Sequence, residues 1–120
     1  MAKRDNLTTE FLNALNEIEI RLFDLSFKKH SFLEKGFACY IDYKKENGTQ
    51  LAFLFGPSDW GIEIILYASE SKFALKDLFA IPEVNNWVNK NRYKQENGRN
   101  LKKELEWYVD LLKVCLPYIE

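Results

Sequence analysis

The sequence predicts an α+β fold in which an N-terminal helix, a three-stranded antiparallel meander and two or three C-terminal helices packed on the sheet form a single domain, 1–120. Apolar residues recur at helical spacing over 8–26, alternate with their neighbours through most of 37–68, and return to helical spacing after residue 71. A chain of 120 residues with 47% hydrophobic residues fits one domain with its own core.

The first helix is predicted over residues 8–26. Its apolar face consists of residues spaced three or four apart, namely Phe11, Leu15, Ile18, Leu22 and Leu25. Thr8 or Thr9 is expected to cap its start, because a threonine oxygen accepts a backbone N–H there. Residues 27–36 follow no single period, so a short strand and a loop are equally compatible with them.

The meander is predicted from strand-like runs separated by turn residues. In chain order these are strand 37–44, the turn Asn47-Gly48, strand 51–55, the turn Gly56-Pro57-Ser58-Asp59 and strand 60–68. Asn-Gly favours a tight hairpin because both residues readily adopt positive φ angles. On the third strand, Ile65 and Tyr67 lie opposite a face that is already apolar, so we expect this strand to be partly covered on both sides.

The remaining residues are predicted to form helices. Ser71 is expected to cap a short helix that carries Phe73 and Leu78, and Pro82 to open the next one. A final helix begins near Asn100, and its apolar stripe is wider than one packing surface needs. Pro117 is expected to distort or stop this helix near its end.

Charge and composition exclude several classes of partner. Seventeen basic and 18 acidic residues give a net charge of −1, whereas nucleic-acid binders usually carry a basic excess or a basic face, so we expect no nucleic-acid partner. No run approaches the roughly 18 apolar residues of a membrane span, and the start lacks an apolar leader, so we expect no membrane partner and a cytoplasmic protein. Two separated cysteines, Cys39 and Cys115, indicate no disulfide framework.

The sequence indicates no catalytic residues, no metal site and no cofactor. His30 is the single histidine, and no carboxylate or nucleophile stands at a fixed spacing from it. The order of elements nevertheless resembles the core of restriction-type, metal-dependent nucleases, whose strands carry an Asp followed by Glu-x-Lys. Asp59 and Glu63 are too close together for that pattern, and Ile65 occupies the lysine position. We expect the protein not to be an enzyme; the alternative hypothesis is a metal-dependent, nuclease-like hydrolase that uses acids of the meander.

The candidate binding residues lie on two surfaces. Asp59, Trp60 and Glu63 offer an aromatic anchor beside acids, and Trp107 with Leu111 widens the apolar stripe of the last helix. In general organisation the chain resembles two bacterial groups, small immunity proteins that neutralise a toxin and secretion chaperones that hold an extended client. No motif supports that resemblance, and it implies no functional residue. It implies a protein-binding module, best described as an immunity-type inhibitor or a chaperone-like adaptor; a structural homodimer joined through the last helix is the other possibility.

Overall fold

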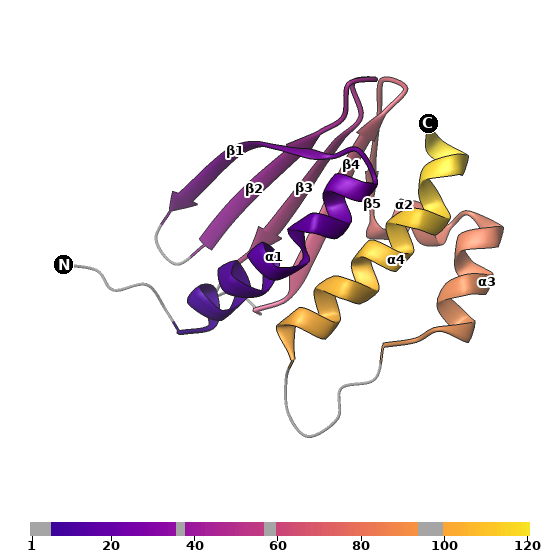
Figure 1. Cartoon of the computed structure of the whole chain (residues 1–120). Coiled ribbons are helices and arrows are strands. Elements are labelled where there is room, and N and C mark those ends of the chain that lie inside the picture. The colour runs from indigo at the N-terminus through magenta and orange to yellow at the C-terminus, as the bar shows by residue number, and fades with distance from the viewer. Residues whose placement is uncertain (1–5, 36–37, 57–59, 94–99) are drawn as a thin grey trace.

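The computed structural model describes residues 6–35, 38–56, 60–93 and 100–120, and these residues form an α+β fold (Figure 1). The elements in chain order are α1 (Asn6–Asp24), β1 (Lys28–Lys35), β2 (Ala38–Lys44), β3 (Gln50–Phe55), β4 (Ile62–Ala68), β5 (Ser71–Ala74), α2 (Leu75–Phe79), α3 (Pro82–Lys90) and α4 (Leu101–Ile119).

The sheet has five strands in the order β1-β2-β3-β4-β5, and every neighbouring pair is antiparallel. The α+β class is confirmed, but the prediction of three strands is wrong. The sequence left 27–36 open between strand and loop, and β1 forms there. At the other edge, Ser71 begins β5 instead of capping a helix. The helix α2 starts only at Leu75, where the Asp77 carboxylate accepts a hydrogen bond from the Ala74 N–H at 2.8 Å.

The hairpin between β4 and β5 explains this error. Ala68 pairs with Ser71, so only Ser69 and Glu70 form the turn, and their φ angles are +51° and +65°. Two positive φ angles are what a two-residue hairpin needs, but Asn and Gly normally supply them. The sequence therefore carries no turn signal at this point.

A hairpin forms at Asn47-Gly48 as predicted, although the loop between β2 and β3 runs over 45–49 and of these two residues only Gly48 adopts a positive φ. Gly48 has a φ of +95°, the Lys45 N–H donates to the Thr49 carbonyl at 2.8 Å, and the Asn47 side-chain oxygen accepts from the Thr49 N–H at 3.0 Å. These bonds close a short loop between β2 and β3, as the favoured chemistry of this dipeptide predicts.

Helix α1 begins and ends two residues earlier than predicted. Ser26 adopts a φ of +73°, the Phe27 N–H donates to the Leu22 carbonyl, and the Ser26 N–H donates to the Phe23 carbonyl, each at 2.9 Å. This pair of bonds is a Schellman motif, with Ser26 in the position that glycine usually occupies. Because Leu22 and Phe27 are both buried, the motif also directs the chain from the helix into β1.

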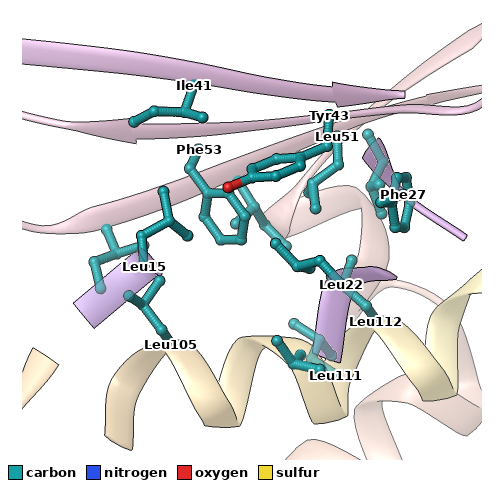
Figure 2. Close-up of a cluster of buried hydrophobic side chains, with 14 of the residues drawn as sticks. Leu15, Leu22, Phe27, Ile41, Tyr43, Leu51, Phe53, Leu105, Leu111 and Leu112 are labelled. Carbon is teal, nitrogen blue, oxygen red and sulfur yellow. The ribbon is translucent and has the colours of Figure 1, made fainter. Parts of the chain in front are cut away.

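The core lies between the sheet and two helices, α1 and α4, which pack side by side on one face of the sheet (Figures 1 and 2). Alternate strand residues point into it, and the Phe11 ring of α1 stacks on the Phe55 ring of β3 with centroids 4.5 Å apart. The predicted stripe of α1 is buried as far as Leu22, whereas Leu25 lies beyond the helix and is partly exposed. All the buried hydrophobic residues of the described ranges form one cluster.

The last two helices, α3 (Pro82–Lys90) and α4 (Leu101–Ile119), begin where the sequence predicts. Pro82 occupies the first turn of α3, and the Asn100 side chain caps α4 by accepting from the Lys103 N–H at 3.0 Å. Pro117 does not stop α4. The Glu120 N–H still bonds to the Leu116 carbonyl at 3.0 Å, and burial of Ile119 holds the last turn against the core.

Candidate functional site

The face of the sheet opposite α1 and α4, called here the outer face, presents side chains in rows that the antiparallel register fixes. One row crosses four strands through Leu33, Tyr40, Leu54 and Glu63. The adjacent row crosses all five strands through Ser31, Asp42, Ala52, Ile65 and Ala74. Directly opposed residues in such a ladder are about 5 Å apart, so each row is a continuous surface.

The middle of the outer face is apolar. We call Leu33, Tyr40, Ala52, Leu54 and Ile65 the outer patch. Leu33 is 58% exposed and Tyr40 is 38% exposed, while the other three are partly exposed. The solvent face of an antiparallel sheet is normally polar, so this surface departs from the usual alternation. The sequence predicts partial cover for this side of β4, but no described helix covers it, and Tyr67 beside the patch is also exposed.

Charged side chains of opposite sign border the outer patch. Glu63 ends the first row, and Asp42 accepts a hydrogen bond from the Ser31 hydroxyl at 2.7 Å within the second. A third row, on the other side of the patch from Glu63, carries Lys28, Lys44 and Lys72. Acids and lysines thus stand at fixed positions around the apolar residues, with Asp42 between Tyr40 and Lys44 on β2 and Lys35 two residues from Leu33 on β1, and such a pattern gives a docking partner a preferred orientation.

A polar cluster joins the end of α4 to the β2–β3 turn. The Glu120 carboxylate accepts from the Lys45 ammonium at 2.8 and 2.9 Å, from the Asn47 amide at 2.8 Å and from the Thr49 hydroxyl at 2.8 Å. Burial raises the pKa of the Glu120 carboxyl, but the hydrogen bonds from these three side chains and the Lys45 charge outweigh it, so the pKa lies below its usual value. This cluster fixes a hairpin to a helix, which is a structural role.

A second polar contact connects α1 to the sheet at β2 and β1. The buried Tyr43 hydroxyl donates to the Glu19 carboxylate at 2.8 Å, and Lys29 of β1 approaches the same carboxylate at 3.2 Å. Burial raises the pKa of the Tyr43 hydroxyl far above its ordinary value, and the bond to Glu19 and its negative charge raise it further. Tyr43 therefore stays protonated and acts as a donor.

A hollow of about 370 Å³ opens where α1 meets the start of β1. It is lined by Phe23, Ser26, Phe27, Lys28 and Lys29, and its wall is almost wholly apolar. Lys28 pairs with Lys44 on the outer side of the sheet, whereas Lys29 pairs with the inward-pointing Tyr43. The hollow therefore lies at the N-terminal end of β1, where side chains of both faces of the strand border it.

The residues that the sequence singled out separate into different surroundings. Glu63 lies on the outer face, and Asp59 lies outside the described residues. Trp60 is partly buried against Phe55, with ring centroids 5.4 Å apart, and its φ of +53° is unusual for so bulky a residue. The structure does not describe residues 57–59, so the turn Gly56-Pro57-Ser58-Asp59 stays a prediction.

Trp107 and Leu111 are used within the chain itself. The Trp107 ring packs on Trp87 of α3 with centroids 5.6 Å apart, and its indole N–H donates to the Asn91 carbonyl. Leu111 is fully buried. The wide apolar stripe of α4 contacts the sheet, α1 and α3, and this explains its width. An interface with a second copy through α4 stays a prediction.

The potential metal ligands and nucleophiles do not converge in the described ranges. His30 is exposed on β1 beside a bulge, and Cys39 and Cys115 are buried thiols that are not joined in a disulfide. Burial raises the pKa of the Cys115 thiol to about 12. Within residues 6–35, 38–56, 60–93 and 100–120, no group of three or more His, Cys, Asp or Glu is placed to hold a metal ion. The helices of these ranges are too short or too polar to cross a membrane.

Sequence reasoning missed the outer patch and the edge of β1. Ile65 and Tyr67 already indicate a second apolar side on β4, but the sequence does not distinguish a covered surface from an exposed binding surface. Leu54 and Tyr40 add to that side only once the strand register is known. The edge of β1 had no usable signal, because 28–35 alternates poorly and contains the bulge between Lys29 and Ser31.

Comparison with known proteins finds no family model that matches this sequence, and no significant similarity to a curated protein or to a solved structure.

Proposed function

We propose that this chain is a protein-binding module that acts through the outer face of its sheet. The observation that carries the proposal is the outer patch, because a contiguous apolar area with a charged border is typical of a protein interaction site. The patch is built on the rigid strands β1–β4, so binding would require little ordering of the chain.

Among binding modules, an immunity-type inhibitor is the first candidate. Such a protein blocks a toxin by covering it, and complementary charge steers the encounter. Glu63 and Asp42 offer acids beside the apolar middle of the outer face. A partner with a basic group opposite Glu63 and an apolar area opposite Tyr40 and Leu54 fits this arrangement.

Site-specific photo-crosslinking tests the proposal directly. We expect a benzophenone amino acid in place of Tyr40, at the centre of the outer patch, to capture a protein partner in cells of the native host. Adding Leu54→Glu should abolish capture, because a charge would then face the partner's apolar surface. The same label in place of Tyr118, an exposed aromatic residue of α4, is the matched control.

Either of two outcomes would refute the use of this surface. One is capture of the same proteins from both positions, and the other is capture from Tyr40 that Leu54→Glu leaves unchanged. If a partner is captured as expected, purified chain should inhibit that partner's activity at equimolar concentration. A partner that retains full activity when bound would argue for a chaperone-like adaptor instead of an inhibitor.

A further inference from the structure

The free edge of β1 is an unusually long exposed strand edge. β1 has eight residues, every one of them exposed, whereas a typical strand has about five or six. It is the first strand of the sheet, and β2 is its only neighbour in the described ranges. An edge strand has outward-pointing N–H and C=O groups, which are a template for pairing with another extended segment.

Apolar surface accompanies this edge on the helix side of the sheet. The hollow lined by Phe23 and Phe27 opens at the start of β1, and Phe23 is 47% exposed at its rim. Further along the strand, Phe32 pairs with the inward-pointing Ile41 and yet remains half-exposed, because β1 is an edge strand. A strand added to β1 would therefore find an apolar hollow at one end and an aromatic ring near the middle.

Charge identifies the occupant. β1 carries Lys28 and Lys35 against the single acid Glu34, and its third lysine, Lys29, already pairs with Glu19 of α1. Two copies of β1 paired edge to edge would bring two sets of lysines onto one ladder, which like-charge repulsion opposes. An acidic segment would be attracted to the same edge.

We propose that the free edge of β1 binds an extended segment of a partner protein as a sixth strand. The segment alternates apolar with acidic residues, and it places one apolar side chain in the hollow lined by Phe23, Phe27 and Lys28. The bulge between Lys29 and Ser31 divides the edge into a regular ladder over Ser31–Lys35 and an anchoring end at the hollow. This inference uses a different surface from the outer patch and does not rest on it.

Two labelled peptides test the charge and the strand geometry. The probes are eight-residue peptides, capped at both ends, in which leucine alternates either with glutamate or with lysine. Fluorescence anisotropy on the full 120-residue chain should show that the glutamate peptide binds about tenfold more tightly at low salt, and that added salt reduces the difference. The bound peptide should slow amide hydrogen exchange in β1 and leave that of β5 unchanged.

A pair of variants on α1 tests the anchor. Phe23→Glu places a carboxylate in the hollow and should weaken binding of the glutamate peptide at least about tenfold. Ile20→Glu makes a similar change at a residue that is 63% exposed on the same helix but does not line the hollow, and it should weaken binding about twofold at most. Circular dichroism checks that both variants remain folded. Leu54→Glu, on the outer patch, should bind the peptide like the unmodified chain.

Several results would overturn the inference. If the chain binds the two peptides equally well, or binds neither of them, the charge argument fails. If Phe23→Glu and Ile20→Glu weaken peptide binding equally, the hollow is not the anchor. If only Leu54→Glu weakens it, the peptide binds at the outer patch. A native dimer in which β1 amides are already protected without peptide would show that a second copy occupies the edge.

Discussion

Replacing Glu120 by glutamine should remove much of the bond between the end of α4 and the β2–β3 turn. The substitution keeps the shape of the side chain but removes the charge that Lys45, Asn47 and Thr49 bind. The Lys45 and Glu120 side chains are only 16% and 22% exposed, so their interaction is less screened by solvent than that of a typical surface pair. Loss of the charge also leaves the Lys45 ammonium without its carboxylate.

The size of the effect follows from two limits. A hydrogen bond to a charged group contributes about 1.5–3 kcal/mol when buried, whereas an exposed ion pair contributes about 1 kcal/mol or less. Glutamine retains an oxygen that can still accept from Asn47 or Thr49. We therefore expect Glu120→Gln to lower the free energy of unfolding by about 1.5 kcal/mol, equivalent to roughly 5 °C in Tm for a chain of this length.

Urea unfolding followed by tryptophan fluorescence measures this loss at pH 7. Asp110→Asn is the matched control, since it removes an exposed acid from the same helix and should change stability by less than about 0.5 kcal/mol. A double-mutant cycle with Lys45→Met should show that most of the loss is shared between Lys45 and Glu120.

The loss should depend on pH in a defined direction. The pKa of the folded-state Glu120 carboxyl lies below the ordinary value of 4.5, so its contribution is fully present above pH 4.5 and is lost as pH falls through the folded-state pKa. In acid the native side chain is neutral like glutamine, and the two proteins should become equally stable. Equal stability at pH 7, or a difference that persists undiminished in acid, would refute the role assigned to this carboxylate.

Three further predictions concern the fold. Glu70→Gly should be about 1 kcal/mol more stable than Glu70→Ala in thermal melts, because the φ of Glu70 is +65°; equal stability would show that the turn is unstrained. The Cys115 thiol should resist Ellman's reagent at pH 8 until the protein unfolds, since burial raises its pKa to about 12, and rapid reaction of the native state would contradict that burial. Light-scattering chromatography of the native chain and of the Trp107→Glu, Leu111→Glu variant should show that the variant unfolds. The two substitutions should lower the free energy of unfolding by at least about 4 kcal/mol, because Leu111 is fully buried. A native dimer that becomes a folded monomer would instead show that α4 is an interface between copies.

Helices and the central hairpin were predictable because their signals are local. The periodic stripe of Phe11, Leu15 and Ile18 depends only on spacing along one helix, and the Asn47-Gly48 turn depends on two adjacent residues. The end of α1 was predicted too late because its stop signal is Ser26 in a conformation that usually requires glycine.

The edge strands and the binding surfaces depend on tertiary partners instead. β5 forms because Ser69 and Glu70 adopt positive φ angles while Ala68 pairs with Ser71. No sequence pattern predicts this turn. In the sequence, Glu63 is a candidate only through its position near Asp59 and Trp60. Its neighbours on the outer face, Leu54 and Tyr40, come from other strands, so only the register could assemble them.

The position of α4 at residues 101–119 has a consequence during synthesis. All five strands and the helices α1, α2 and α3 leave the ribosome before this helix, so the growing chain carries a sheet whose inner face, with Phe53 and Ile64, still lacks the cover of α4. The outer patch is apolar as well, and the nascent sheet therefore exposes apolar surface on both sides. Sheets in that state aggregate readily at cellular concentrations. Truncation of the chain before α4 should accordingly yield an insoluble product that a chaperone retains, even though every strand is present.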